Sequence, residues 1–167
     1  GLTGSLNSDP SFSTNDAVLL DSGLQLCGAI DVVERRRDLE IVGATGVSVR
    51  AVDTKTGAVA VPVGAVINGG RTLQPVLYSL ALEKLVPDAY VEGGRLSFAT
   101  SRGGFEVRDI PLSDEARRGA KEVTDVLQSH LSRGFFPAAP REGACTYCEY
   151  KSICGAERRK RAFQLKM

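Results

Sequence analysis

Two aspartates stand inside apolar segments, and they limit the folds that the chain can adopt. Asp31 lies in GAIDVVE at residues 28–34, and Asp53 lies in AVDTKTG at residues 51–57. A carboxylate among apolar side chains is costly unless a cation or hydrogen bonds compensate it. We therefore expect strands that bring each aspartate to such a partner.

Strands are expected in the first third of the chain, where β-branched and apolar residues are bounded by turn signals. Residues 17–34 predict two strands around a turn at 21–23, and residues 47–55 predict another. The charged stretch at residues 35–38 predicts a hairpin tip or loop. Residues 58–71 are expected to be irregular, with a strong turn signal at residues 68–70.

Two helices and a second hairpin are expected further along. The first helix covers residues 72–85, with Pro75 in its first turn, where a missing N–H costs little. Residues 90–110 predict a hairpin with strands at 95–100 and 105–110. Ser113 caps a second helix that ends near residue 132. The apolar stripe of the first helix is predicted to comprise Leu73, Leu77, Leu80 and Ala81.

This order of strands, helix, strands and helix predicts an α/β domain with a mixed central sheet flanked by helices. A chain of 167 residues is long enough for one domain with a buried core. Four parts are expected: a flexible lead-in at 1–16, a core at 17–139, a cysteine loop at 140–155 and a basic tail at 156–167.

Charge and hydropathy restrict the partners. The net charge is +1, so a nucleic acid would need a local basic patch. The arginines at 35–37 and the basic run at 158–161 could supply one, although solvated faces or interdomain contacts are the alternative. No apolar run is long enough to span a membrane, and no secretory signal precedes residue 17. We expect a cytoplasmic bacterial protein, and a longer parent chain because the sequence begins with glycine and not with an initiating methionine.

The segment around Asp53 has the chemistry of a divalent-ion site. Asp53 and Lys55 are two residues apart, so on a strand they project from one face. The carboxylates of Asp31 and Asp53 and the carbonyl of Thr54 are hard oxygen ligands of the kind that Mg²⁺ or Mn²⁺ takes. Lys55 would hold the attacking water or the phosphate. The alternative is a salt-bridged strand end, with Asp31 at the rim of the sheet.

Gln74 and Tyr78 extend this pattern. They are four residues apart, so they share one face of the predicted helix. The simpler alternative is a helix with one buried tyrosine and one exposed glutamine. The order of acids, lysine, glutamine and tyrosine along the chain favours a common site.

Three cysteines, Cys145, Cys148 and Cys154, fall within ten residues. Soft thiolate ligands at this density suit iron–sulfur or zinc, and free buried thiols are the alternative. Cys27 is expected to be an ordinary buried thiol on the strand face of Asp31, not a fourth ligand. His130 is expected to be a solvated residue of the second helix.

In this order, the segments GAID, AVDTKTG, LQPVLY and CTYCEYKSIC resemble the RecB-like branch of the PD-(D/E)XK nuclease superfamily. The nuclease domain of AddB-type helicase–nuclease subunits is the most similar, over roughly residues 18–155. The resemblance implies a restriction-endonuclease-like core with Asp31 and Asp53 as metal ligands. It also implies that Lys55 is catalytic and that Gln74 and Tyr78 orient the site or contact DNA.

The resemblance also implies a [4Fe–4S] cluster held by Cys145, Cys148, Cys154 and a fourth, upstream cysteine. In the family that fourth cysteine lies in a helical segment before the first strand, and such a segment is absent from this sequence. We therefore expect this chain alone to hold a cluster poorly and to be a weak or inactive nuclease.

The function implied is that of an Mg²⁺- or Mn²⁺-dependent deoxyribonuclease, an exonuclease within a helicase–nuclease that acts on DNA ends in double-strand break repair. Its partners would be DNA and other domains or subunits of that assembly. One alternative is a stand-alone four-cysteine exonuclease of CRISPR adaptation. Another is a catalytically inactive module that grips DNA or braces a partner. A structural iron–sulfur or zinc domain would explain the cysteines but not the acids.

Overall fold

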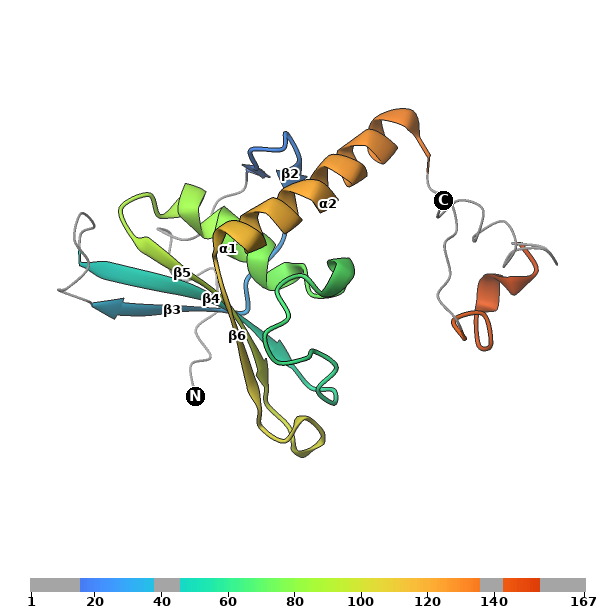
Figure 1. Ribbon diagram of the computed structural model, residues 1–167, viewed down its shortest axis with the longest axis horizontal. Coiled ribbons are helices and arrows are strands. Elements are labelled where there is room, and N and C mark those ends of the chain that lie inside the picture. The colour runs from blue at the N-terminus through green and yellow to red at the C-terminus, as the bar shows by residue number, and fades with distance from the viewer. Residues whose placement is uncertain (1–15, 38–45, 136–142, 154–167) are drawn as a thin grey trace. The chain divides into compact units, whose positions relative to one another are not determined.

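A mixed sheet organises the part of the chain between Val32 and Pro111. The computed structural model describes residues 16–37, 46–135 and 143–153. Only β4 and β5 run parallel, whereas both outer strands pair antiparallel with their neighbours. The sheet is therefore mixed, as predicted (Figure 1). Its order is β3 (Val32–Arg37), β4 (Val47–Lys55), β5 (Tyr90–Phe98) and β6 (Val107–Pro111).

Two helices flank this sheet, which confirms the predicted α/β class. Helix α1 (Gln74–Leu85) makes the crossover that a parallel pair such as β4 and β5 requires. Helix α2 (Asp114–Arg133) follows β6 (Figure 1). Its first turn is capped as predicted, because the hydroxyl of Ser113 accepts a hydrogen bond from the amide of Ala116 at 3.2 Å.

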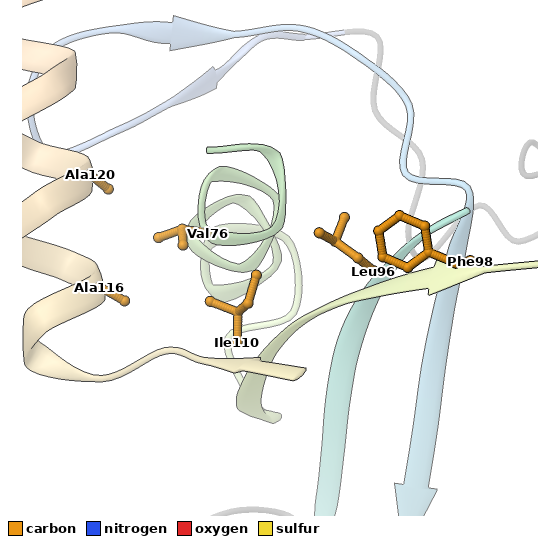
Figure 2. Packing of buried hydrophobic residues seen from close by; sticks show 6 residues of the cluster. All are labelled: Val76, Leu96, Phe98, Ile110, Ala116 and Ala120. Carbon is orange, nitrogen blue, oxygen red and sulfur yellow. The ribbon is translucent and has the colours of Figure 1, made fainter. Parts of the chain in front are cut away.

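The core lies between the sheet and the two helices. Figure 2 shows Val76 of α1 among side chains from the last two strands and from the start of α2. Ala116 and Ala120 of α2 belong to the same buried cluster as Val76, so the start of α2 contributes small side chains to this core. The buried members of this cluster are Val76, Leu96, Phe98, Ile110, Ala116 and Ala120.

The first turn of α1 is pressed against β5 at Gly94. A Cβ atom at Gly94 would lie 2.5 Å from the carbonyl oxygen of Pro75, closer than real side chains come. The absence of a side chain therefore sets how near the beginning of α1 can lie to the sheet. That distance matters because Gln74, a predicted site residue, is the first residue of this helix.

A small hairpin precedes the sheet. Strands β1 (Val18–Leu19) and β2 (Gln25–Leu26) pair antiparallel around the predicted turn, in which Gly23 has φ +82°. Such a backbone conformation favours glycine. Asp21 of this turn accepts a hydrogen bond from Lys84 of α1 at 2.8 Å, so the hairpin is tied to the helix.

Three local predictions were wrong in the region before β4. Residues 35–37, predicted as a loop, belong to β3 and pair with β4 as far as Arg37. An edge strand tolerates such arginines because its outward side chains reach water. Asp31 is exposed and precedes β3, so it is not inside a strand. Cys27 is also exposed and lies outside the strands, so it is not a buried thiol.

Helix α1 also buries a different face from the one predicted. Of the predicted stripe only Ala81 is fully buried, whereas Leu73 and Leu80 are half-buried against the core. The fully buried residues are Pro75, Val76, Ser79, Ala81 and Leu82. A serine can be buried there because its hydroxyl donates to the carbonyl of Pro75 at 2.6 Å, and this internal bond hides its polarity from a hydropathy pattern.

Strand β5 begins at Tyr90, five residues before the predicted start. Gly93 and Gly94 have low strand propensity, so they conceal the first half of the strand in the sequence. Strand β6 begins two residues later than predicted, at Val107. The predicted turn between them contains a short 3₁₀ helix, η4 (Ser101–Gly103), and the earlier irregular stretch contains another, η3 (Asn68–Gly70).

The chain divides into two compact units, Gly1–Gln128 and Ser129–Met167. In the second unit, α2 ends at Arg133, and the next residue, Gly134, has a φ of +61°, the left-handed conformation common after helices. The ring of His130 is half-buried and its Nδ1 lies 3.0 Å from the carbonyl oxygen of Phe135, so it is not simply a solvated residue.

Several predictions fall on parts of the chain that the structure does not describe. These are the lead-in up to residue 15, the boundary at 139–140 and the basic tail at 156–167. Among the described helices, none combines the length and the apolar character that a membrane crossing needs.

Candidate active site

The candidate site lies at the carboxyl end of β4. Asp53 and Lys55 share the face of β4 toward α1, as their spacing predicts. Asp53 is only 6% exposed, and its Oδ2 atom lies 2.6 Å from the Nζ atom of Lys55. That oxygen is buried and makes no hydrogen bond of acceptable geometry among the described residues. A buried carboxylate oxygen compensated by one ion pair alone retains capacity for a cation.

Asp31, the residue just before β3, reaches the same end of β4. The antiparallel register ends with Val32 opposite Val52, so Asp31 follows in line with Asp53 on the neighbouring strand. The Oδ2 atom of Asp31 accepts a hydrogen bond from the backbone amide of Thr54 at 2.8 Å. One oxygen of this carboxylate is therefore anchored on β4 while the side chain stays exposed.

A chain of polar contacts links the strand end to α1. The Nζ atom of Lys55 donates to the Oε1 atom of Gln74 at 2.9 Å. The Nε2 atom of Gln74 donates to the hydroxyl oxygen of Tyr78 at 3.1 Å, across one helical turn. The structure thus brings together Asp53, Lys55, Gln74 and Tyr78. The ring of Tyr78 also packs against the core cluster that includes Leu82.

A pocket of about 350 Å³ opens beside Lys55 and Gln74. Its apolar lining includes Leu96 and Phe98 of β5, and Arg71 also lines it. Arg71 is exposed and has no ion pair or side-chain hydrogen bond within the described residues. Arg71 could not be predicted as a site residue from the sequence, because an isolated arginine beside turn glycines looks like any solvated residue.

The opposite face of the sheet has a different charge pattern. Glu92 accepts hydrogen bonds from Ser48 at 2.8 Å and from Arg50, and Arg36 lies 3.0 Å away. Burial opposes ionisation of Glu92, but these hydrogen bonds and the two arginines outweigh it, so the pKa of this carboxyl is lowered. Arg36, from the predicted basic stretch, is therefore engaged by an acid of the same chain.

Arg95 and Asp109 belong to the same network. Arg95 donates to Asp109 at 2.6 and 3.0 Å, a bidentate pair, and also reaches Glu34 at 3.2 Å. The hydrogen bond from Arg95 lowers the pKa of Asp109, although partial burial opposes that shift. Each charge of this network therefore meets an opposite one.

The cysteine cluster is only partly described. Cys145 is buried and Cys148 is half-buried, both as free thiols, while Cys154 lies outside the described residues. Within the described ranges, no group of three or more histidine, cysteine, aspartate or glutamate side chains is placed to hold a metal ion. At the end of β4, the protein therefore offers the carboxylates of Asp31 and Asp53 as metal ligands. Main-chain oxygens or water would have to complete the coordination shell of a metal ion.

Comparison with known protein families places this geometry in context. Residues 6–155 match the PD-(D/E)XK nuclease superfamily, and this is most of the chain. The chain belongs to that superfamily, and its mixed sheet with two flanking helices is consistent with the restriction-endonuclease-like fold. Membership implies nuclease activity in general, with DNA as substrate and divalent metals as the usual cofactors. No curated protein matches the chain.

Proposed function

We propose that this protein is a divalent-metal-dependent deoxyribonuclease with Asp31, Asp53 and Lys55 at its centre. The observation that carries the proposal is the buried Oδ2 atom of Asp53, which lacks a hydrogen bond within the described residues and faces Lys55 at 2.6 Å. Such an arrangement is unfavourable for a protein that uses it only as structure, because a buried acceptor normally finds its partners.

The carboxylates of Asp31 and Asp53, with the main-chain carbonyl of Thr54, would hold Mg²⁺ or Mn²⁺. The donor set fits, because all three are hard oxygens at one strand end and Asp31 is already fixed there by the amide of Thr54. When bound, the ion would neutralise charge that develops on the phosphate and make water more acidic.

The remaining residues would position the reactants. Lys55 would hold the attacking water or a phosphate oxygen, while Gln74 keeps its ammonium group aimed at the strand end. Tyr78 in turn orients Gln74. In the reaction, the water oxygen bonds to phosphorus, the bond from phosphorus to one sugar oxygen breaks, and that oxygen takes up a proton. Preorganised charge of this kind accounts for much of enzymatic phosphate transfer.

We also propose the wider setting that the four-segment resemblance supports: a domain of a helicase–nuclease that trims DNA ends during double-strand break repair in a bacterial cytoplasm. In this setting, the thiolates of Cys145, Cys148 and Cys154 would join a fourth ligand around a [4Fe–4S] cluster. The buried state of Cys145 suits such a role. Iron and acid-labile sulfide in the proposed helicase–nuclease, purified without oxygen, would support the cluster, and their absence there would remove it from the proposal.

The decisive experiment compares Asp53→Asn with Asp125→Asn within the proposed helicase–nuclease, because this chain alone is expected to be weakly active, on linear and circular DNA in Mg²⁺ or Mn²⁺. Asp125 is an exposed residue of α2 that pairs with Lys121, so its substitution controls for charge alone. We expect Asp53→Asn to lower cleavage by roughly a thousandfold while the melting temperature holds, and Asp125→Asn to leave cleavage unchanged. Equal cleavage by both variants would refute the site. Cleavage of circles as fast as linear DNA would refute action on ends.

A further inference from the structure

The turn between β5 and β6 exposes an aromatic ring in a strained backbone. Phe105 has φ +56° and directly follows Gly104 at φ +63°. This left-handed region favours glycine, and a bulky residue there is an outlier. Its side chain is 70% exposed and makes no aromatic contact within the described residues. Packing inside the protein therefore does not account for a phenylalanine at this position.

This turn is fixed to the strand that carries the candidate site. The amide of Ala99 donates to the carbonyl of Lys55 at 3.0 Å, and the hydroxyl of Thr100 donates to the carbonyl of Thr56 at 3.0 Å. A Cβ atom at Gly103 would lie 2.9 Å from the carbonyl oxygen of Gly57, so the turn and the chain after β4 are in close contact. Figure 1 shows both segments at the same end of the sheet.

The charge of the turn is also uncompensated. Arg102 is exposed and has neither an ion pair nor a side-chain hydrogen bond within the described ranges. The acid that follows, Glu106, is already paired with Arg108 at 2.5 Å. The turn thus presents a flat apolar ring and a cation that have no partners in the described part of the chain.

We propose that Phe105 stacks on an unpaired base of single-stranded DNA beside the candidate active site, with Arg102 on the adjacent phosphate. The inference rests on the proposed nuclease function and adds that the DNA bound beside the site is single-stranded. Aromatic rings and cations are the recurring pair in single-strand binding, because every base has a stacking face and every linkage a charge. In an intact duplex the base faces are covered by their neighbours, so a single protruding ring favours an unpaired strand.

The chain contains no tryptophan, which allows a direct test. Phe105→Trp would introduce one reporter whose fluorescence is quenched when a base stacks on it. The probe is an oligothymidylate titrated into the full chain in EDTA, so that no cleavage occurs. We expect saturable quenching by this single strand and little by a blunt duplex. Tyr90→Trp, at the other end of β5 and 52% exposed, is the matched control and should not respond.

Two further variants of Phe105 exclude misfolding as an explanation, and a third variant tests Arg102. Phe105→Ala should weaken binding of the oligothymidylate about tenfold, a typical loss for one stacked base. Phe105→Gly should weaken it equally and yet keep or raise the melting temperature, since glycine accepts the positive φ. Arg102→Ala should reduce the slope of log affinity against log salt by about 0.7.

The outcomes separate this inference from the proposed function. Quenching in EDTA without cleavage in Mg²⁺, both by this chain and by the proposed helicase–nuclease that contains it, would uphold the stacking contact and refute the nuclease. Cleavage without quenching, at a rate that Phe105→Ala leaves unchanged, would overturn the stacking contact alone. Equal quenching by a blunt duplex, or a large loss of melting temperature in Phe105→Gly with normal binding, would also overturn it.

Discussion

The two faces of the sheet both carry charged side chains but use them differently. On the face away from α1, three arginines and three carboxylates form a closed network in which every member has an opposite partner. On the face toward α1, the carboxylate of Asp53 is more deeply buried than any of these and retains an oxygen without a hydrogen bond within the described residues. Charge is thus common to both faces, and incomplete compensation distinguishes the candidate site.

This difference has a general physical basis. A satisfied network contributes to stability and resists change, because removing one member leaves a partly buried charge unpaired. An unsatisfied buried acceptor costs free energy and persists where a ligand or reaction uses it. Substitutions on the two faces should therefore affect different quantities, cleavage on one and unfolding on the other.

The largest effect is expected from Lys55→Ala. Lys55 contacts both Asp53 and Gln74 at the strand end, so its loss should lower turnover by roughly a thousandfold. DNA affinity should change far less, because the role proposed for Lys55 is in the transition state. Single-turnover cleavage and anisotropy titration measure the two quantities. Lys121→Ala, an exposed lysine of α2, is the matched control. Weakened affinity with normal turnover would make Lys55 a simple phosphate contact.

An intermediate effect is expected from Gly94→Ala, where β5 and α1 touch on the face that carries the candidate site, so that both stability and cleavage should change. The added methyl group would meet the backbone of Pro75 at 2.5 Å and push the start of α1 away from β5. We expect a loss of about 2 kcal/mol in the free energy of unfolding, a typical cost of overpacking. Cleavage per folded molecule should fall as well, because Gln74 would move away from Lys55. Urea unfolding and a cleavage assay test this, and a stable, fully active variant would contradict it.

The smallest effect is expected from Glu92→Gln on the outer face. This substitution should lower the free energy of unfolding by about 1 kcal/mol at neutral pH, measured by urea unfolding, and should leave cleavage unchanged. Because the pKa of Glu92 is lowered in the folded protein, its contribution is present above the unfolded pKa and is lost as the pH falls. The difference between wild type and variant should therefore shrink below about pH 5. A constant difference down to acid pH would assign the loss to packing instead of charge.

Local patterns predicted the parts of the site that depend on spacing within one element. Asp53 and Lys55 are two residues apart on a strand and therefore share one of its faces. The predicted bounds of that strand, 47–55, match β4. Gln74 and Tyr78 lie one turn apart on α1 and form the contact that this spacing allows. In each case the side chains share a face because of a spacing of two residues in a strand or four in a helix. A short segment of sequence is therefore enough to predict which side chains lie together.

Features that depend on distant partners could not be predicted in this way. The arginines at 35–37 lie in a strand because β4 pairs with them, and Arg36 is compensated by Glu92 from β5. Cys27 is exposed because the strand expected around it does not form. The position of Phe105 near the end of β4 follows from contacts across more than forty residues, which no local pattern contains.

The anchoring of Asp31 has a consequence for how the protein tolerates sequence change. Its hydrogen bond is donated by the main chain of Thr54, whose own side chain is exposed. Every amino acid except proline supplies that amide, so position 54 can vary widely without releasing the carboxylate. This contact therefore places no demand on the side chain at position 54, whereas the roles proposed for Asp53 and Lys55 depend on their side chains.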